Sequence, residues 1–131
     1  MALKIGVVSQ KGGVGKSTLS RMIACEYARS GWHVKIADMD ASQGTSFNWQ
    51  RRRIEQAVEP QVAVEMFRRV ADVEKIADNY DLIVFDGAPH STQQTLQIAQ
   101  ISALIILPTG NALDDLEPTI RLAHELYLQE V

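Results

Sequence analysis

Cysteine is almost absent from the sequence, in which Cys25 is the single thiol among 131 residues. One thiol excludes an internal disulfide and is too few to hold an iron–sulfur cluster. No apolar run is longer than a handful of residues, so the sequence predicts no membrane-spanning segment. A strand pattern begins at once and leaves no room for a signal peptide, so we expect a cytoplasmic protein.

An excess of basic charge is also lacking. The chain has 13 Lys and Arg against 16 Asp and Glu, a net charge of −3, and a pI of about 5.5. This balance argues against binding nucleic acid through bulk charge, although it leaves room for a local basic patch. The runs Arg51–Arg53 and Arg68–Arg69 are more typical of a solvated surface than of nucleic-acid contacts. The histidines lack the spacing of metal ligands.

Strand and helix patterns alternate along the chain, as in an α/β domain. The fold expected is a mainly parallel sheet with helices on both faces, within a single domain of residues 1–131. Strands are predicted at 4–9, 33–38, 62–67, 82–85 and 103–107, the last two as central strands because they are uninterrupted apolar runs. Helices are predicted after residue 18, over 46–56, 70–77 and 96–101, and from Asp114 or Asp115 as N-cap, with Pro118 in the first turn.

The most informative segment is a glycine-rich loop between the first strand and the first helix. Its residues are predicted to bind a nucleotide: Gly12, Gly13, Val14, Gly15, Lys16, Ser17 and Thr18. Glycines let backbone N–H groups turn toward an anion, and the helix N-terminus adds partial positive charge. Lys16 would neutralise phosphate oxygens, and the Ser17 hydroxyl would ligate Mg²⁺.

Aspartates follow two of the predicted strands. Asp38 and Asp40 come at the end of the second strand, where parallel sheets gather ligand-binding groups. Such a pair in isolation could instead be a strand-end turn with a capping role. Asp86 ends the apolar strand 82–85, where a carboxylate can hold Mg²⁺ through its waters.

The loop departs from the standard phosphate-loop pattern, because Gln10 stands where the first glycine is expected. Its sequence K-G-G-V-G-K-S-T closely resembles the deviant Walker A box of the ParA/MinD family of ATPases. Asn48-Trp49, Asp86-Gly87-Ala88-Pro89 and Leu113-Asp114 resemble the small plasmid-partition ParA proteins that lack an N-terminal DNA-binding domain. The resemblance implies a P-loop NTPase fold that binds ATP and Mg²⁺.

The resemblance also implies roles for three site residues. Lys11 would reach across a dimer to the nucleotide of the other subunit, and we group it with Lys16 and Asp40 as catalytic. Asp40 would orient or deprotonate the attacking water, while Asp38 would face the hydration shell of the metal. The family's Asp-Pro-Gln is replaced here by a segment one residue longer without the proline, so no role is assigned to Gln43.

The function implied is an ATP-dependent dimerising switch with slow basal turnover that acts in plasmid or chromosome partition. Its partners would be a second copy, a centromere-binding adaptor and, for a full-length form, nonspecific DNA on the nucleoid. Family members continue well beyond this length, so we expect a chain that lacks the usual C-terminal strands. A nucleotide-binding regulator without turnover and a cell-division-site positioning ATPase remain alternatives. The last helix carries Glu125 and Glu130 with Arg121 as its strong base, which argues against membrane binding.

Overall fold

The computed structural model describes residues 1–10, 12–13, 15–40, 45–89 and 92–128 of the chain. The strands are β1 (Leu3–Val7), β2 (Val34–Asp38), β3 (Ala63–Met66), β4 (Leu82–Asp86) and β5 (Leu104–Ile106). The helices are α1 (Lys16–Arg29), α2 (Thr45–Glu55), α3 (Val70–Ile76) with the short 3₁₀ turn η1 (Ala77–Asn79), α4 (Thr92–Ile101) and α5 (Leu113–Leu128). These bounds lie within two residues of most predicted ones, as expected for fraying element ends.

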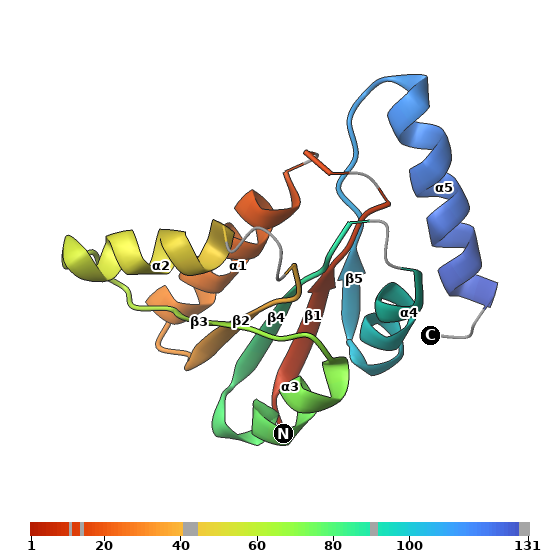
Figure 1. Ribbon diagram of the computed structural model, residues 1–131. Coiled ribbons are helices and arrows are strands. Elements are labelled where there is room, and N and C mark those ends of the chain that lie inside the picture. Colours follow the sequence, from red (N-terminus) through yellow and green to blue (C-terminus); the bar gives the residue numbers. More distant parts are fainter. Residues whose placement is uncertain (11, 14, 41–44, 90–91, 129–131) are drawn as a thin grey trace.

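The strands form one parallel sheet in the order β3-β2-β4-β1-β5. Because all strands run the same way, their carboxyl ends meet at one edge, which is the upper edge in Figure 1. The connection after β1 leads through α1 to β2, toward one edge of the sheet. The connection after β4 leads through α4 to β5, at the other edge. In such sheets ligands bind where neighbouring connections diverge, so the fold directs attention to the ends of β1 and β4.

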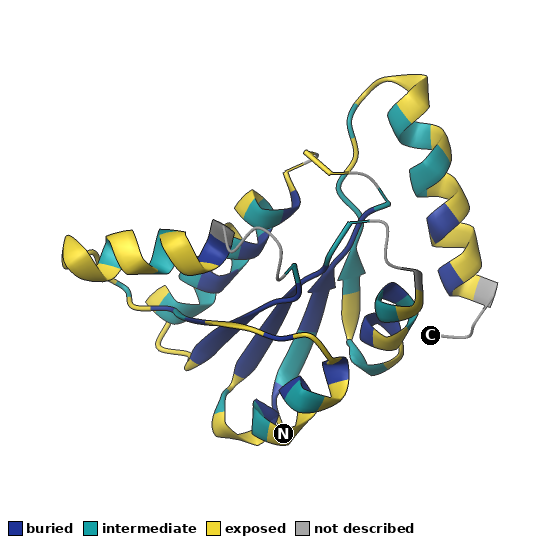
Figure 2. Cartoon of the chain, viewed as in Figure 1, coloured by how far each residue is buried: buried dark blue, intermediate teal, exposed yellow. Residues whose placement is uncertain are grey.

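Helices cover both faces of the sheet (Figure 1), which confirms the predicted fold class. On one face α1 and α2 pack on a buried cluster that includes Ala24, Ile36 and Val84. On the other face α3 and α4 pack on a second cluster that includes Val73, Phe85 and Ile98. The central strands are therefore buried on both sides (Figure 2), and this rigid layer positions the groups at their carboxyl ends.

The predicted central position of strand 103–107 is wrong for the part of the chain that the structure describes. There β5 pairs with β1 alone and is an edge strand, and Leu104 is 54% exposed. Ile105 nevertheless packs toward α4 and α5, and Ile106 packs on the opposite face. An apolar run indicates that both faces of a strand are covered by other elements. It does not indicate whether the strand pairs with a neighbouring strand along both of its edges.

The start of the last helix also differs from the prediction. Helix α5 begins at Leu113, so Asp114 and Asp115 lie in its first turn and neither is the N-cap. There they still interact favourably with the positive end of the helix dipole. Pro118 is the sixth helical residue rather than part of the first turn, so the carbonyl of Asp114 lacks its usual N–H donor. No helix in the described ranges is long and apolar enough to cross a membrane.

Replacing Gly6 by alanine is expected to destabilise the fold. A Cβ built at Gly6 would lie 2.6 Å from Ile98 Cγ2 and 2.7 Å from Ile105 Cδ1, so the side chains of α4 and β5 packed there would have to move. Overpacking of this kind costs about 1–3 kcal/mol of unfolding free energy. Urea denaturation of parent and Gly6→Ala protein measures the difference. Gly12→Ala is the matched control for packing, since apart from its chain neighbours no atom of the described residues lies within 4 Å of a Cβ there.

Candidate functional site

The glycine-rich loop ends at the start of α1 with two glycines in the left-handed backbone region. Gly13 has φ +74° and Gly15 has φ +91°, a conformation that residues with a side chain adopt only with strain. Gly15 is the N-cap of α1, and no side chain of the described residues caps the helix there. The first N–H groups of α1 therefore remain available to an anion. Lys11 and Val14 lie outside the described residues.

Three side chains from α1 and α2 converge on Asp86 at the end of β4. Lys16 Nζ lies 3.1 Å from Asp86 Oδ1, and both side chains are buried. Asp86 Oδ2 accepts hydrogen bonds from Ser17 Oγ at 2.9 Å and from Ser46 Oγ at 3.2 Å. The carboxylate is thereby held by one ammonium group and two hydroxyls, a set that replaces its lost hydration.

Asp38 lies directly beside Asp86, because the two residues are register partners on β2 and β4. Its Oδ1 accepts the backbone N–H of Asp40 at 3.0 Å. Burial raises the pKa of Asp38, the negative charges of Asp86 and Asp40 add to this effect, and backbone N–H groups oppose it. Two adjacent buried carboxylates favour a cation between them, which suits a metal site.

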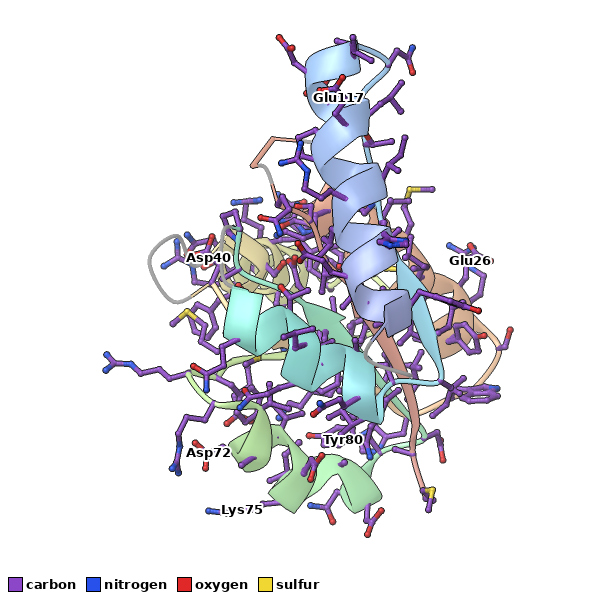
Figure 3. All side chains as sticks on the ribbon, turned by 90° about the vertical axis from the view of Figure 1, so that its right-hand side faces the viewer. Glu26, Asp40, Asp72, Lys75, Tyr80 and Glu117 are labelled. Carbon is purple, nitrogen blue, oxygen red and sulfur yellow. The ribbon has the colours of Figure 1, made fainter. Side chains whose placement is uncertain are left out.

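Asp40 follows β2 and is half-buried at the same end of the sheet. In Figure 3 it is labelled well above Asp72 and Lys75 of α3, which mark the opposite end of the molecule. Asp40 lines a cavity of about 380 Å³ together with Gly12, Gly13, Gly15, Lys16, Ser17, Thr18, Asp38 and Pro89. The structure thus places the described candidate residues around one cavity, with Asp86 directly behind Lys16 and Ser17.

The cavity combines groups suited to phosphate with groups suited to a hard cation. Lys16 and the uncapped start of α1 can neutralise phosphate oxygens. In the described ranges, no cluster of three or more His, Cys, Asp or Glu could hold a metal ion alone. The carboxylate of Asp38, with the Ser17 hydroxyl and Asp86 beside it, suits Mg²⁺, which is usually held by one or two carboxylates together with phosphate oxygens and waters. A nucleotide with Mg²⁺ therefore fits the residues present.

Sequence reasoning missed Ser46 and the packing of Arg53. Ser46 is fully buried, and a signal was available, since a serine at the start of the helix after Asp38 and Asp40 suggests a hydroxyl near them. The prediction that the run Arg51–Arg53 lies on a solvated surface is right for Arg51 and Arg52, which are exposed, and wrong for Arg53, which is half-buried. Arg53 packs over the ring of Trp49 and donates to the carbonyl of Pro60.

Comparisons with known proteins point to one family. The sequence pattern described as the CobQ/CobB/MinD/ParA nucleotide binding domain matches residues 5–130. No curated protein sequence matches the chain significantly.

Three solved structures share the fold. One is the pNOB8 ParA protein bound to nonspecific DNA, with TM-score 0.72 and 18% identity, covering 95% of this chain and 59% of that one. A second is a partition protein from Borrelia burgdorferi B31 bound to AMPPNP, with TM-score 0.72 and 18% identity, covering 100% of this chain and 71% of that one. The third is the septum site-determining protein MinD from Pyrococcus horikoshii, complexed with Mg-ADP, with TM-score 0.71 and 17% identity. The match covers 98% of this chain and 66% of the MinD chain.

The chain thus spans 59% of the length of the ParA protein it resembles. At these identities the structural likeness establishes the fold, and the match over residues 5–130 establishes the family. The chain therefore belongs to the CobQ/CobB/MinD/ParA nucleotide-binding domain family.

Proposed function

We propose that this chain is an ATP-dependent, dimerising switch ATPase of the ParA type that acts in plasmid or chromosome partition. The observation that carries the nucleotide part is the convergence of Lys16, Ser17 and Asp86 at one end of the cavity. The partition part rests on the second lysine of the loop, Lys11, and on the likeness to partition proteins.

Each described residue has a task that its position supports. Lys16 and the first N–H groups of α1 bind the phosphates, so Lys16 exchanges Asp86 for phosphate oxygens. Ser17 would hold Mg²⁺, with Asp86 and Asp38 acting on its waters. The metal, when bound, neutralises charge that develops on the phosphoryl oxygens. Asp40 faces the same cavity and orients or deprotonates the attacking water.

We assign Lys11 to contact the nucleotide that is bound by the facing subunit. Lys16 already serves the phosphates of its own loop, so a second flexible cation five residues earlier is better placed for a nucleotide presented by a second copy. We therefore propose an ATP-dependent homodimer, with a centromere-binding adaptor that stimulates hydrolysis and nonspecific DNA as a further partner of a full-length form. The site of action would be the cytoplasm, on the nucleoid.

Replacing Lys11 by alanine is expected to leave ATP binding intact and to abolish the ATP-dependent dimer. Light scattering on parent and Lys11→Ala protein, each with ATP and with ADP, measures the mass directly. Lys4→Ala, which removes a lysine of β1 outside the loop, is the matched control and is expected to dimerise like the parent. A dimer that survives Lys11→Ala unchanged would contradict the switch assignment.

A nucleotide-binding regulator without turnover is the second candidate function. It is favoured by the grouping of Lys16, Ser17 and Asp38 around one cavity, which supports nucleotide binding whether or not hydrolysis follows. If the parent protein binds ATP, stays monomeric with it and hydrolyses none, the regulator replaces the switch.

A further inference from the structure

Among the described residues, Asp86 has two kinds of side-chain partner. Lys16, on Oδ1, and Ser17, on Oδ2, both line the nucleotide cavity. Ser46 donates its hydroxyl to Oδ2 at 3.2 Å, and it is not among the described residues that line that cavity. A ligand that fills the cavity can therefore draw Lys16 and Ser17 away from Asp86 without contacting Ser46.

Ser46 and Asp86 form their hydrogen bond in a part of the protein that is shielded from water. Ser46 is 0% exposed and Asp86 is 2% exposed. Breaking a buried bond between a hydroxyl and a carboxylate leaves both groups unsatisfied, so the bond persists. It joins the second residue of α2 to the last residue of β4, 40 positions apart. Ser46 therefore anchors the Asp86 carboxylate from α2.

Ser46 also acts on Asp38, the register partner of Asp86 on β2. The backbone N–H of Ser46 and that of Asp40 both oppose the rise in the pKa of Asp38. As the second residue of α2, Ser46 lies at the positive end of that helix dipole, which favours negative charge nearby. One residue thus supports both carboxylates, Asp86 through its hydroxyl and Asp38 through its amide.

The tasks proposed for Lys16 and Ser17 change what holds Asp86. Lys16 exchanges Asp86 for phosphate oxygens, and the oxygen of Ser17 turns to Mg²⁺. Of the three side chains that hold Asp86 among the described residues, Ser46 alone has no second task. Outer hydrogen-bond partners orient the groups that act on a metal. The bond from Ser46 therefore matters most when nucleotide and metal are bound.

We propose that Ser46 is a positioning residue that keeps the Asp86 carboxylate directed at the waters of Mg²⁺ when Lys16 and Ser17 turn to the nucleotide. The inference rests on the proposed nucleotide and Mg²⁺ site. Without ligand, Lys16 and Ser17 also hold Asp86, so the carboxylate stays in place when the Ser46 hydroxyl is removed. With nucleotide and Mg²⁺ bound, the same removal leaves the carboxylate free to turn.

The test measures ADP binding with and without Mg²⁺, because ADP occupies the proposed site without turnover. Calorimetric titration of ADP in Mg²⁺ and in EDTA gives the factor by which the metal raises ADP affinity. Titration of Mg²⁺ into the ADP complex gives the metal affinity itself. In Ser46→Ala, Mg²⁺ affinity is expected to fall by about 10–100-fold, the usual loss when an outer partner of a metal site is removed. ADP affinity in EDTA should stay at the parental value.

Three further variants separate the hydrogen bond from packing. Ser46→Cys nearly keeps the volume but has only a weak donor, so it should lose Mg²⁺ affinity as Ser46→Ala does, and it carries the test if Ser46→Ala does not fold. Ser46→Thr keeps the hydroxyl and should retain more Mg²⁺ affinity than either. Ser20→Ala is the matched control, since Ser20 is also 0% exposed but donates to the carbonyl of Lys16 within α1. It should bind ADP and Mg²⁺ like the parent.

The outcomes separate this inference from the proposed function. A parent protein that binds no ADP, or binds it without any effect of Mg²⁺, overturns both the proposed site and the role of Ser46. Parental Mg²⁺ affinity in Ser46→Ala overturns the role of Ser46 and leaves the nucleotide site standing. An equal loss of ADP affinity in Mg²⁺ and in EDTA shows that Ser46 only supports the fold, and this also overturns the inference. A loss of Mg²⁺ affinity that Ser20→Ala reproduces has the same consequence.

Discussion

Replacing Lys16 by alanine is expected to abolish measurable ATP binding. Lys16 is the one lysine or arginine among the described residues that line the cavity, and its Nζ lies 3.1 Å from Asp86 Oδ1. Hydrogen bonds to charged groups are worth about 1.5–3 kcal/mol each, and Lys16 would make more than one to the phosphates. Calorimetric titration with ATP and Mg²⁺ should therefore show affinity reduced by at least about a hundredfold, using about 1.4 kcal/mol per factor of ten.

The same substitution has a second effect that the structure makes visible. It leaves the buried carboxylate of Asp86 without its ammonium partner, a change that costs about 3–5 kcal/mol in comparable buried pairs. The thermal stability of the Lys16→Ala protein should therefore be measured alongside the titration. Lys16→Ala combined with Asp86→Asn removes the orphaned charge and should recover stability without recovering ATP affinity.

Lys75→Ala, at an exposed position on α3, is the matched control and should bind ATP like the parent. A folded Lys16→Ala protein that bound ATP with parental affinity would show that the cavity at the start of α1 is not the nucleotide site.

Asp40→Ala is expected to retain nucleotide affinity and to lose turnover. The contact of Asp40 with Asp38 runs through the backbone N–H, so substitution of the side chain leaves that turn in place. A carboxylate that positions or deprotonates water acts on the chemical step, and such groups contribute about 10²–10⁴ in rate. We therefore expect kcat to fall by that factor while calorimetric affinity changes by less than about threefold.

Two variants sharpen this test. Asp40→Asn keeps the shape of the side chain and removes its charge, so it should lose turnover as Asp40→Ala does. Asp78→Ala removes an exposed carboxylate of η1 at the opposite end of the sheet and should behave as the parent. Hydrolysis at the parental rate in Asp40→Ala would remove Asp40 from the mechanism. Because basal turnover is expected to be slow, single-turnover measurement with excess protein is the suitable assay.

The local elements were predictable because their signals are short-range. Alternating apolar runs and helical spacing depend on residues a few positions apart, and they located the strands and helices to within two residues in most cases. The glycines of the loop were equally readable, since the backbone at Gly13 and Gly15 requires a positive φ.

Several of the errors concern contacts that no local sequence pattern signals. Strand 103–107 was expected to be central because its residues are apolar, yet the number of its neighbours follows from strand order. Arg53 looked like part of a solvated run, but the ring of Trp49 in the preceding turn and the carbonyl of Pro60 leave it half-buried. The position of Ser46 after Asp38 and Asp40 suggested a hydroxyl near them, but its bond to Asp86 depends on how α2 lies against β4.

Local sequence patterns were enough to predict an alternating α/β chain with a glycine-rich loop after its first strand and aspartates at the ends of two others. The folded arrangement was needed to see that Asp38 and Asp86 are neighbours, that Lys16 pairs with a carboxylate 70 residues away, and that hydroxyls of α1 and α2 share one oxygen. This is because periodicity and turn chemistry act over a few residues. Strand order and side-chain convergence depend instead on burying both faces of the whole sheet at once.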